Sequence, residues 1–191
     1  MDDRTPGATD PVDLGDEVWL IDTRMGGYDG ITAGYLIRGE RPALVETGAA
    51  RSADEVVRAL AALGIGPDDL ATIVVTHIHL DHAGGVGDLA AAFPRAEVVV
   101  HAAGARHLVD PSRLLASAAR VFGPVLDELF GPLLPTDAAR VRALVLHQAG
   151  RLRDDVPGDV LQCYLDLVLD GLVARLAAGE DPDRLSAVLD L

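Results

Sequence analysis

The spacing of apolar and polar positions predicts short strands and helices that alternate along most of the chain. Continuous or alternating apolar runs bounded by Gly-rich turns are typical of strands, and they occur at 18–22, 32–37, 42–46, 71–76, 96–100 and 140–146. The first three are predicted to be antiparallel. Helical spacing predicts helices over 52–63, 86–93 and 112–122, with a further helical piece ending at Phe130.

The end of the sequence has a different pattern. Residues 160–178 carry apolar side chains around most of a helical circumference, and 183–189 predict a second, short helix. The long helix is interpreted either as an ordinary core helix, which is favoured, or as a surface that pairs with another subunit. We expect residues 1–15 to form a flexible leader and 16–191 to form one domain, with 147–191 as its C-terminal helical segment.

Candidate chemistry is concentrated directly after the apolar run at 71–75. The stretch His77-Ile78-His79-Leu80-Asp81-His82 offers three imidazoles and a carboxylate within six residues. Divalent metals such as zinc bind this mixture of nitrogen and oxygen donors. Gly84 and Gly85 follow, and we expect them to permit unusual backbone angles and a close approach to the metal site. The stretch therefore predicts a metal site at a strand end.

This histidine stretch resembles the first metal motif of the metallo-β-lactamase superfamily. The resemblance extends to the predicted strands 18–23, 32–37 and 42–48, the last ending in Glu46-Thr47-Gly48, and to 96–101 and 104–111. It covers residues 15 to 142 or so. The resemblance implies an α/β (α+β) fold of the αββα sandwich type whose second half is incomplete, so that the first sheet exposes an apolar face.

The resemblance also implies a reaction. His77 and His79 would hold one metal ion, and Asp81 and His82 a second. One or two Zn²⁺ ions would bind a water molecule, and zinc lowers the pKa of such a water to about 7. The resulting hydroxide would attack an ester, thioester, lactone or similar bond. Asp81 would act as the catalytic residue that orients this nucleophile and handles its proton.

The resemblance predicts further ligands later in the chain, and few residues match them. No Pro-Gly-His turn is present, and the later histidines are His101, His107 and His147. His147 follows the apolar run 143–146 and is the remaining ligand candidate. The Gly158-Asp159 pair is interpreted as a helix N-cap rather than as a bridging aspartate. His101 and His107 are assigned structural roles.

Composition narrows the choice of partners and of compartment. The formal net charge is −14, and the sixteen basic residues are all arginines spread along the chain, which argues against nucleic acid and favours a small-molecule substrate. The 191 residues include no apolar run long enough to span a membrane. The single cysteine, Cys163, fits a reducing compartment, and the polar start of the chain lacks the basic and apolar stretches of a signal peptide, so we expect a cytoplasmic protein.

Three functions are compatible with these observations. The leading hypothesis is a zinc-dependent hydrolase, weakened by missing ligands. The second is a catalytically degenerate protein of the same fold that acts through metal binding or association, including a homodimer formed through the C-terminal helix. The third is an iron-dependent, sulfur-oxidising member of the superfamily. Members that reduce oxygen at a diiron centre carry Glu at the second ligand position, where this chain has His79, and this favours zinc.

Overall fold

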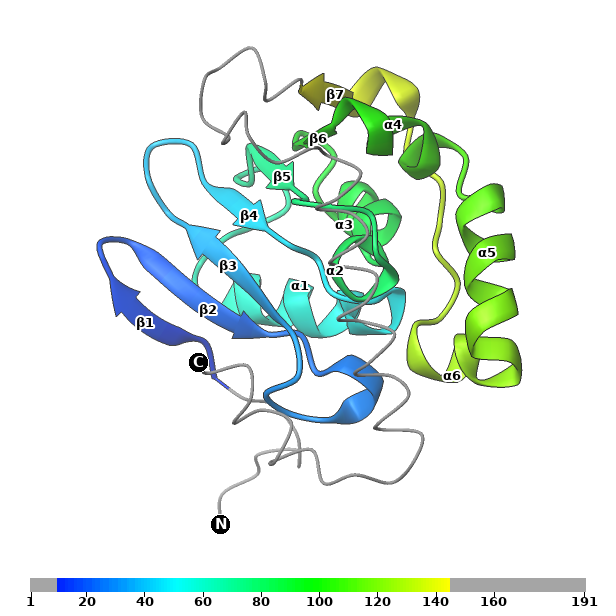
Figure 1. The fold of residues 1–191 in the computed structure, drawn as a ribbon. Helices are drawn as coiled ribbons and strands as arrows, with labels where there is room; N and C mark the ends of the chain where they lie inside the picture. Colours follow the sequence, from blue (N-terminus) through cyan, green and yellow to red (C-terminus); the bar gives the residue numbers. More distant parts are fainter. Residues whose placement is uncertain (1–9, 145–191) are drawn as a thin grey trace, which may run out of the picture. The chain divides into compact units, whose positions relative to one another are not determined.

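Seven strands form a single sheet in the computed structural model, which describes residues 10–144 (Figure 1). Their spatial order follows the sequence: β1 (Val12–Gly15), β2 (Val18–Asp22), β3 (Ala33–Ile37), β4 (Ala43–Val45), β5 (Thr72–Val74), β6 (Glu97–His101) and β7 (Val141–Leu144). The pairs from β1 to β4 are antiparallel, and the pairs from β4 to β7 are parallel. The parallel half needs crossover connections, and these contain the helices.

Six α-helices and four short 3₁₀ segments connect the strands. The helices are α1 (Ala53–Ala62), α2 (Leu80–Ala83), α3 (Val86–Ala92), α4 (Ala102–Val109), α5 (Ser112–Phe122) and α6 (Leu126–Leu129). The 3₁₀ segments within residues 10–144 are η1 (Met25–Gly27), η2 (Ala50–Ser52), η3 (Gly123–Val125) and η4 (Ala138–Arg140). None of the helices described is long and apolar enough to cross a bilayer.

The main core lies between one face of the sheet and helices α1, α3 and α4. Alternate strand residues point to this face because successive side chains in a strand project to opposite sides. They pack with apolar side chains of the three helices, and the buried cluster includes Ile21, Leu36, Leu44, Ile73 and Val98 from the sheet and Val56, Leu60, Val86, Leu89 and Leu108 from the helices. The mixed sheet covered by helices agrees with the predicted fold class.

The elements predicted within residues 10–144 are present with shifted ends, and β1, α2 and α4 have no counterpart among the predicted ranges. Val12–Gly15, which fell within the predicted leader, forms β1 and pairs with β2. Ser52 makes no side-chain cap at the start of α1, and Glu55 pairs with Arg58. Here η2 leads directly into α1, so Ser52 already has helical backbone angles. His147 and the predicted helices at 160–178 and 183–189 lie outside the described residues.

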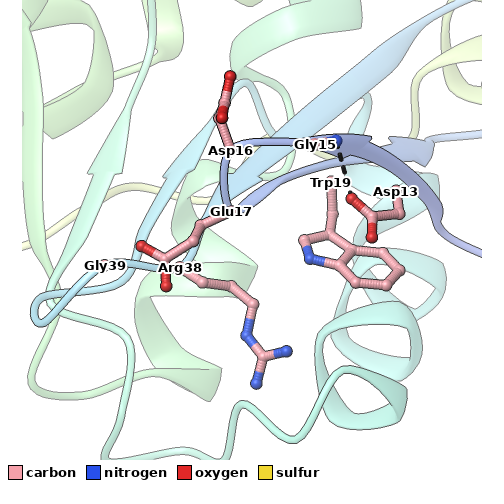
Figure 2. Close-up of a pocket in the computed structure, with 7 residues that line it drawn as sticks. All are labelled: Asp13, Gly15, Asp16, Glu17, Trp19, Arg38 and Gly39. Atoms are coloured by element: carbon pink, nitrogen blue, oxygen red, sulfur yellow. Dashed lines mark hydrogen bonds between the residues drawn. The ribbon is translucent and has the colours of Figure 1, made fainter.

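The hairpin between β1 and β2 turns through two residues in an unfavourable conformation. Asp16 and Glu17 have φ of 49° and 63°, the left-handed values of a type I′ turn, which favours Asn-Gly. Figure 2 shows this turn beside Trp19, with the Asp13 carboxylate accepting a hydrogen bond from the Gly15 N–H at 2.8 Å. Non-glycine residues are strained in this region by roughly 1–2 kcal/mol each.

Replacing Glu17 with glycine should therefore stabilise the fold by about 1 kcal/mol, because glycine adopts positive φ without a Cβ clash. Urea or thermal unfolding measures the change. Glu40→Gly is the matched control: it removes the same charge at an exposed position that does not have positive φ. An equal gain in both variants would show that charge, not turn strain, limits stability.

Candidate metal centre

Five potential metal-binding side chains meet at the carboxyl ends of β4 and β5. The two strands are parallel neighbours with Val45 paired to Val74, so the residues that follow each strand emerge at the same edge of the sheet. Glu46 directly follows β4, and the histidine loop follows β5. His79 is the N-cap residue of α2, and Asp81 and His82 lie in its single turn.

The three imidazoles are grouped closely. The ring centroid of His77 lies 4.7 Å from that of His79 and 4.2 Å from that of His82. Glu46, His77 and His82 each offer one ligand atom, and these three atoms lie within 4.8 Å of one another. The structure thus brings together the four predicted ligands of the histidine loop and adds a fifth group, Glu46.

His82 lies between two carboxylates. Its Nε2 is 3.2 Å from Asp81 Oδ2, and its Nδ1 is 3.2 Å from Glu46 Oε2. Two ligand atoms of one tetrahedral zinc ion lie about 3.3–3.5 Å apart, given metal–ligand bonds of about 2.0–2.2 Å. The Asp81–His82 pair already has the spacing of two ligands of one ion.

Glu46 was not among the predicted site residues. Its carboxylate is buried, its Oε1 accepts the Thr76 N–H at 2.9 Å, and its backbone has φ of 66°, an uncommon value that recurs at functional sites. Its Oε2 is buried and accepts no hydrogen bond within the described residues, although it faces His82. Metal-bound histidines commonly direct their second nitrogen to a carboxylate, and this fixes the ring. The available signal was the Glu46-Thr47-Gly48 turn.

The loop after β4 is tied to the histidine loop through the backbone. Both the N–H and the hydroxyl of Thr47 donate to the carbonyl of His82, each at 2.8 Å. Gly84 and Gly85 have ordinary negative φ, −60° and −85°, so the prediction of unusual angles is wrong. A Cβ on Gly84 would lie only 2.9 Å from the Cα of Ala49. Close packing against this loop, rather than turn geometry, requires glycine there.

The carboxylates and imidazoles shift one another's protonation. Burial lowers the pKa of His82, but Asp81 and Glu46 outweigh burial and raise that pKa to about 10. Burial raises the pKa values of Asp81 and Glu46, yet contact with His82 leaves both below their ordinary range. Burial also lowers the pKa of His77, and the charges of His82 and His79 act in the same direction. In the metal-free protein, His82 therefore carries a proton at neutral pH.

The donor set fits a divalent transition metal. It combines imidazoles with carboxylates, and among the described residues the buried Glu46 Oε2 accepts no hydrogen bond and is compensated by its ion pair with His82. The other described histidines lie in structural positions. His101 caps α4 by accepting the Ala103 N–H at 3.3 Å, and His107 accepts a bond from the neighbouring Arg106 at 3.1 Å. His147 lies outside the described residues.

The protein thus has a mixed sheet with helices packed on one face and a candidate metal centre at the carboxyl ends of β4 and β5. A family model described as "Metallo-beta-lactamase superfamily" matches residues 27–158. The chain belongs to the metallo-beta-lactamase superfamily.

Solved structures support the fold. A HARLDQ-motif mutant of a metallo-beta-lactamase from Cronobacter sakazakii is 25% identical with a TM-score of 0.51, and the match covers 71% of this chain and 48% of that one. A subclass B3 metallo-beta-lactamase from a soil metagenome library is 24% identical with a TM-score of 0.53, over 72% of this chain and 46% of that one. This chain therefore spans about half the length of these proteins.

Matches to curated proteins are shorter. Metallo-beta-lactamase domain-containing protein 1 of Rattus norvegicus is 41% identical over 59 residues, which are 31% of this chain and 22% of that protein. The HTH-type transcriptional repressor Rv1474c of Mycobacterium tuberculosis is 82% identical over 44 residues, 23% of this chain and 24% of the repressor. The chain thus spans about a quarter of the length of these relatives.

Without metal, His82 should titrate near pH 10 rather than at its ordinary 6.5. Its protonation then stabilises the fold fully below about pH 6.5, and this contribution is lost as the pH rises through 10. The lowered pKa values of Asp81 and Glu46 act oppositely: their contribution is present above their ordinary 3.8 and 4.5 and is lost as the pH falls. An NMR titration of the His82 imidazole in chelator-treated protein tests this.

Asp81→Asn should lower the pKa of His82, because that carboxylate is the leading attractive partner of the imidazolium. Asp54→Asn, on the exposed side of α1, removes the same charge away from His82 and serves as the control. A His82 titration near pH 6.5 in the unsubstituted protein would contradict the assigned contacts.

Proposed function

We propose that this protein is a metal-dependent hydrolase and that zinc is held by His77, His79, Asp81 and His82, with His147 as a candidate further ligand. The observation that carries the proposal is the convergence of three imidazoles and the Asp81 carboxylate at the edge where β4 and β5 end. Superfamily membership supports the same chemistry. The substrate class we propose is a small molecule with an ester, thioester, lactone or similar bond.

In the proposed hydrolysis, the zinc ion and the protein side chains would have different roles. Bound zinc supplies a hydroxide near neutral pH by lowering the pKa of a coordinated water to about 7. Asp81 is placed to hold or accept a proton beside this site, since its carboxylate lies 3.2 Å from His82 and stays ionised. Glu46 keeps the His82 ring in place from the opposite side. His82 must give up its proton to bind an ion, so binding is coupled to proton release.

Two alternatives to the zinc-dependent hydrolase are also proposed. An iron-loaded, sulfur-oxidising protein uses the same ligands, and His79 is the residue that argues for zinc over a diiron oxygen-reducing centre. A degenerate protein of the same fold that acts through metal binding or association, including a homodimer through the C-terminal helix, is the other alternative. A repressor's DNA binding is not proposed, since that likeness covers a quarter of each chain and the net charge is −14.

Metal analysis of the purified protein tests the ligand set directly. We expect at least about one equivalent of zinc, and His77→Ala or Asp81→Ala should weaken binding by about tenfold or more, because each removes a ligand atom. His107→Ala is the control, since His107 contacts only Arg106 among the interactions described. Less than one equivalent of any transition metal, unchanged by the two ligand substitutions, would refute the proposal. Iron in place of zinc would favour the sulfur-oxidising alternative.

Glu46→Gln should weaken zinc binding by about 10- to 100-fold, the usual cost of removing a carboxylate that orients a metal-bound histidine. Isothermal titration calorimetry with zinc measures the affinity. Glu97→Gln offers a matched control, because Glu97 starts β6 and pairs with Arg142 of β7, away from the histidine loop. Equal affinity of the Glu46→Gln variant and the unsubstituted protein would show that Glu46 has no role in metal binding.

A further inference from the structure

A second, smaller apolar core is separate from the main core, and we call it the edge core. Its buried members come from segments that are distant in the sequence, and partly buried side chains of η1, α5 and α6 pack against them. The buried members are Ala49, Leu80, Leu126, Phe130 and Leu133. The edge core therefore joins the loops at one edge of the sheet to the helices that precede β7.

The edge core includes one side chain from each of the two loops that carry candidate ligands. Ala49 is fully buried and follows Glu46 by three residues. Leu80 is 6% exposed and stands between His79 and Asp81. The positions of both loops are thus coupled to a single apolar cluster that contains no candidate ligand atom.

Leu80 begins α2, a helix of four residues that depends on packing. Forming one hydrogen-bonded turn fixes several backbone angles for a single hydrogen bond, so a helix this short has little stability of its own. The N–H groups of His82 and Ala83 close the turn by donating to the carbonyl of His79 at 3.0 and 2.8 Å. Ala83 packs in the main core with one methyl group. Leu80 supplies the larger apolar anchor, in the edge core.

Helices α5 and α6 supply the other side of the edge core (Figure 1). The rings of Phe122 and Phe130 meet edge to face, with centroids 4.8 Å apart. Arg51 of η2 ties α6 to the loop after β4. Its N–H donates to the carbonyl of Phe130 at 3.1 Å, and its Nε donates to the carbonyl of Asp127 at 2.6 Å. Hydrogen bonds as well as apolar contacts therefore hold α6 against this loop.

We propose that Leu80 is a positioning residue: its packing in the edge core sets the backbone of His79 and Asp81, so that α5 and α6 hold two candidate ligands in place from outside the site. The inference rests on the proposed metal-dependent function. Ligand atoms need to be held within about 0.5 Å of their binding positions. An ordered loop binds an ion more tightly because it loses less conformational freedom on binding. Leu80 offers no atom to a metal ion, so its effect acts through this ordering alone.

Zinc titration calorimetry of the chelator-treated full chain tests the role of Leu80. Leu80→Ala should weaken zinc binding by about tenfold or more, because the ligands on either side of it lose their anchor. Leu126→Ala should weaken binding in the same direction, although it changes no residue of the histidine loop. Leu80→Met conserves the side-chain volume and should restore the affinity. Leu60→Ala is the matched control: it deletes the same atoms from a fully buried position of α1 in the main core, so it should lower the Tm and leave the zinc affinity unchanged.

Amide hydrogen exchange of the metal-free protein gives a readout that does not need zinc. The N–H of His82 should exchange about tenfold faster in Leu80→Ala and in Leu126→Ala, because the turn of α2 opens more often. The N–H of Val75, which donates to the carbonyl of Val99 at 3.0 Å, is the reference and should change less. Thermal unfolding verifies that each variant is folded, and Leu126→Ala tests the proposal in the case that Leu80→Ala does not fold.

Three outcomes would overturn the proposal. The first is an unchanged zinc affinity in folded Leu80→Ala. The second is equal weakening by Leu60→Ala, which would show that general stability limits binding. The third is an equal loss of protection at His82 and Val75, which would show that Leu80 supports the fold as a whole. A failure of the proposed function has a different result: the unsubstituted protein would bind no zinc, and the exchange of His82 relative to Val75 would still decide the role of Leu80.

Discussion

The parallel pairing of β4 with β5 is the constraint on which the candidate site depends. This pairing brings the turn after β4 and the histidine loop after β5 to the same edge. Three contacts then fix their relative position: Thr76 N–H to Glu46 Oε1, and the two bonds from Thr47 to the carbonyl of His82. A shift of one residue in this register would reverse every side chain of β4. The ligand cluster would then lose both its carboxylate at Glu46 and its packing at Gly84.

The same contacts describe a candidate site whose charges compensate one another in the absence of a metal ion. In the metal-free state, protonated His82 supplies a positive charge between Asp81 and Glu46, which would otherwise be two buried carboxylates in a restricted space. A divalent ion bound there would supply positive charge to the same carboxylates and would displace that proton. Proton and metal would therefore be alternatives at one position. The charge of His82 makes a cluster with two acidic groups and three imidazoles compatible with a folded chain that holds no metal.

The sequence predicted those parts of the fold that local pattern controls. Apolar runs located the strands from β2 to β7, and the His77–His82 spacing located candidate ligands that the fold brings together, because both are properties of contiguous residues. Glu46 escaped prediction as a site residue because its role depends on a partner strand thirty residues away and on a left-handed backbone angle. The β1 strand was missed because the turn at Asp16-Glu17 lacks the Asn-Gly signal of a type I′ hairpin. Exposed Val12 and Leu14 did not resemble a core strand.

The two faces of the sheet differ in what their side chains contact. Helices α1, α3 and α4 pack on one face, and the connection that contains α2 carries the histidine loop, so the candidate site depends on the packed side and on the carboxyl edge of the sheet. The opposite face belongs to the same strands and carries none of the candidate ligand side chains. A substitution at exposed Ile37 therefore changes that face without touching Glu46 or the histidine loop, while its neighbour Leu36 lies in the core. Alternation along a single strand keeps the two faces of one short sheet separate.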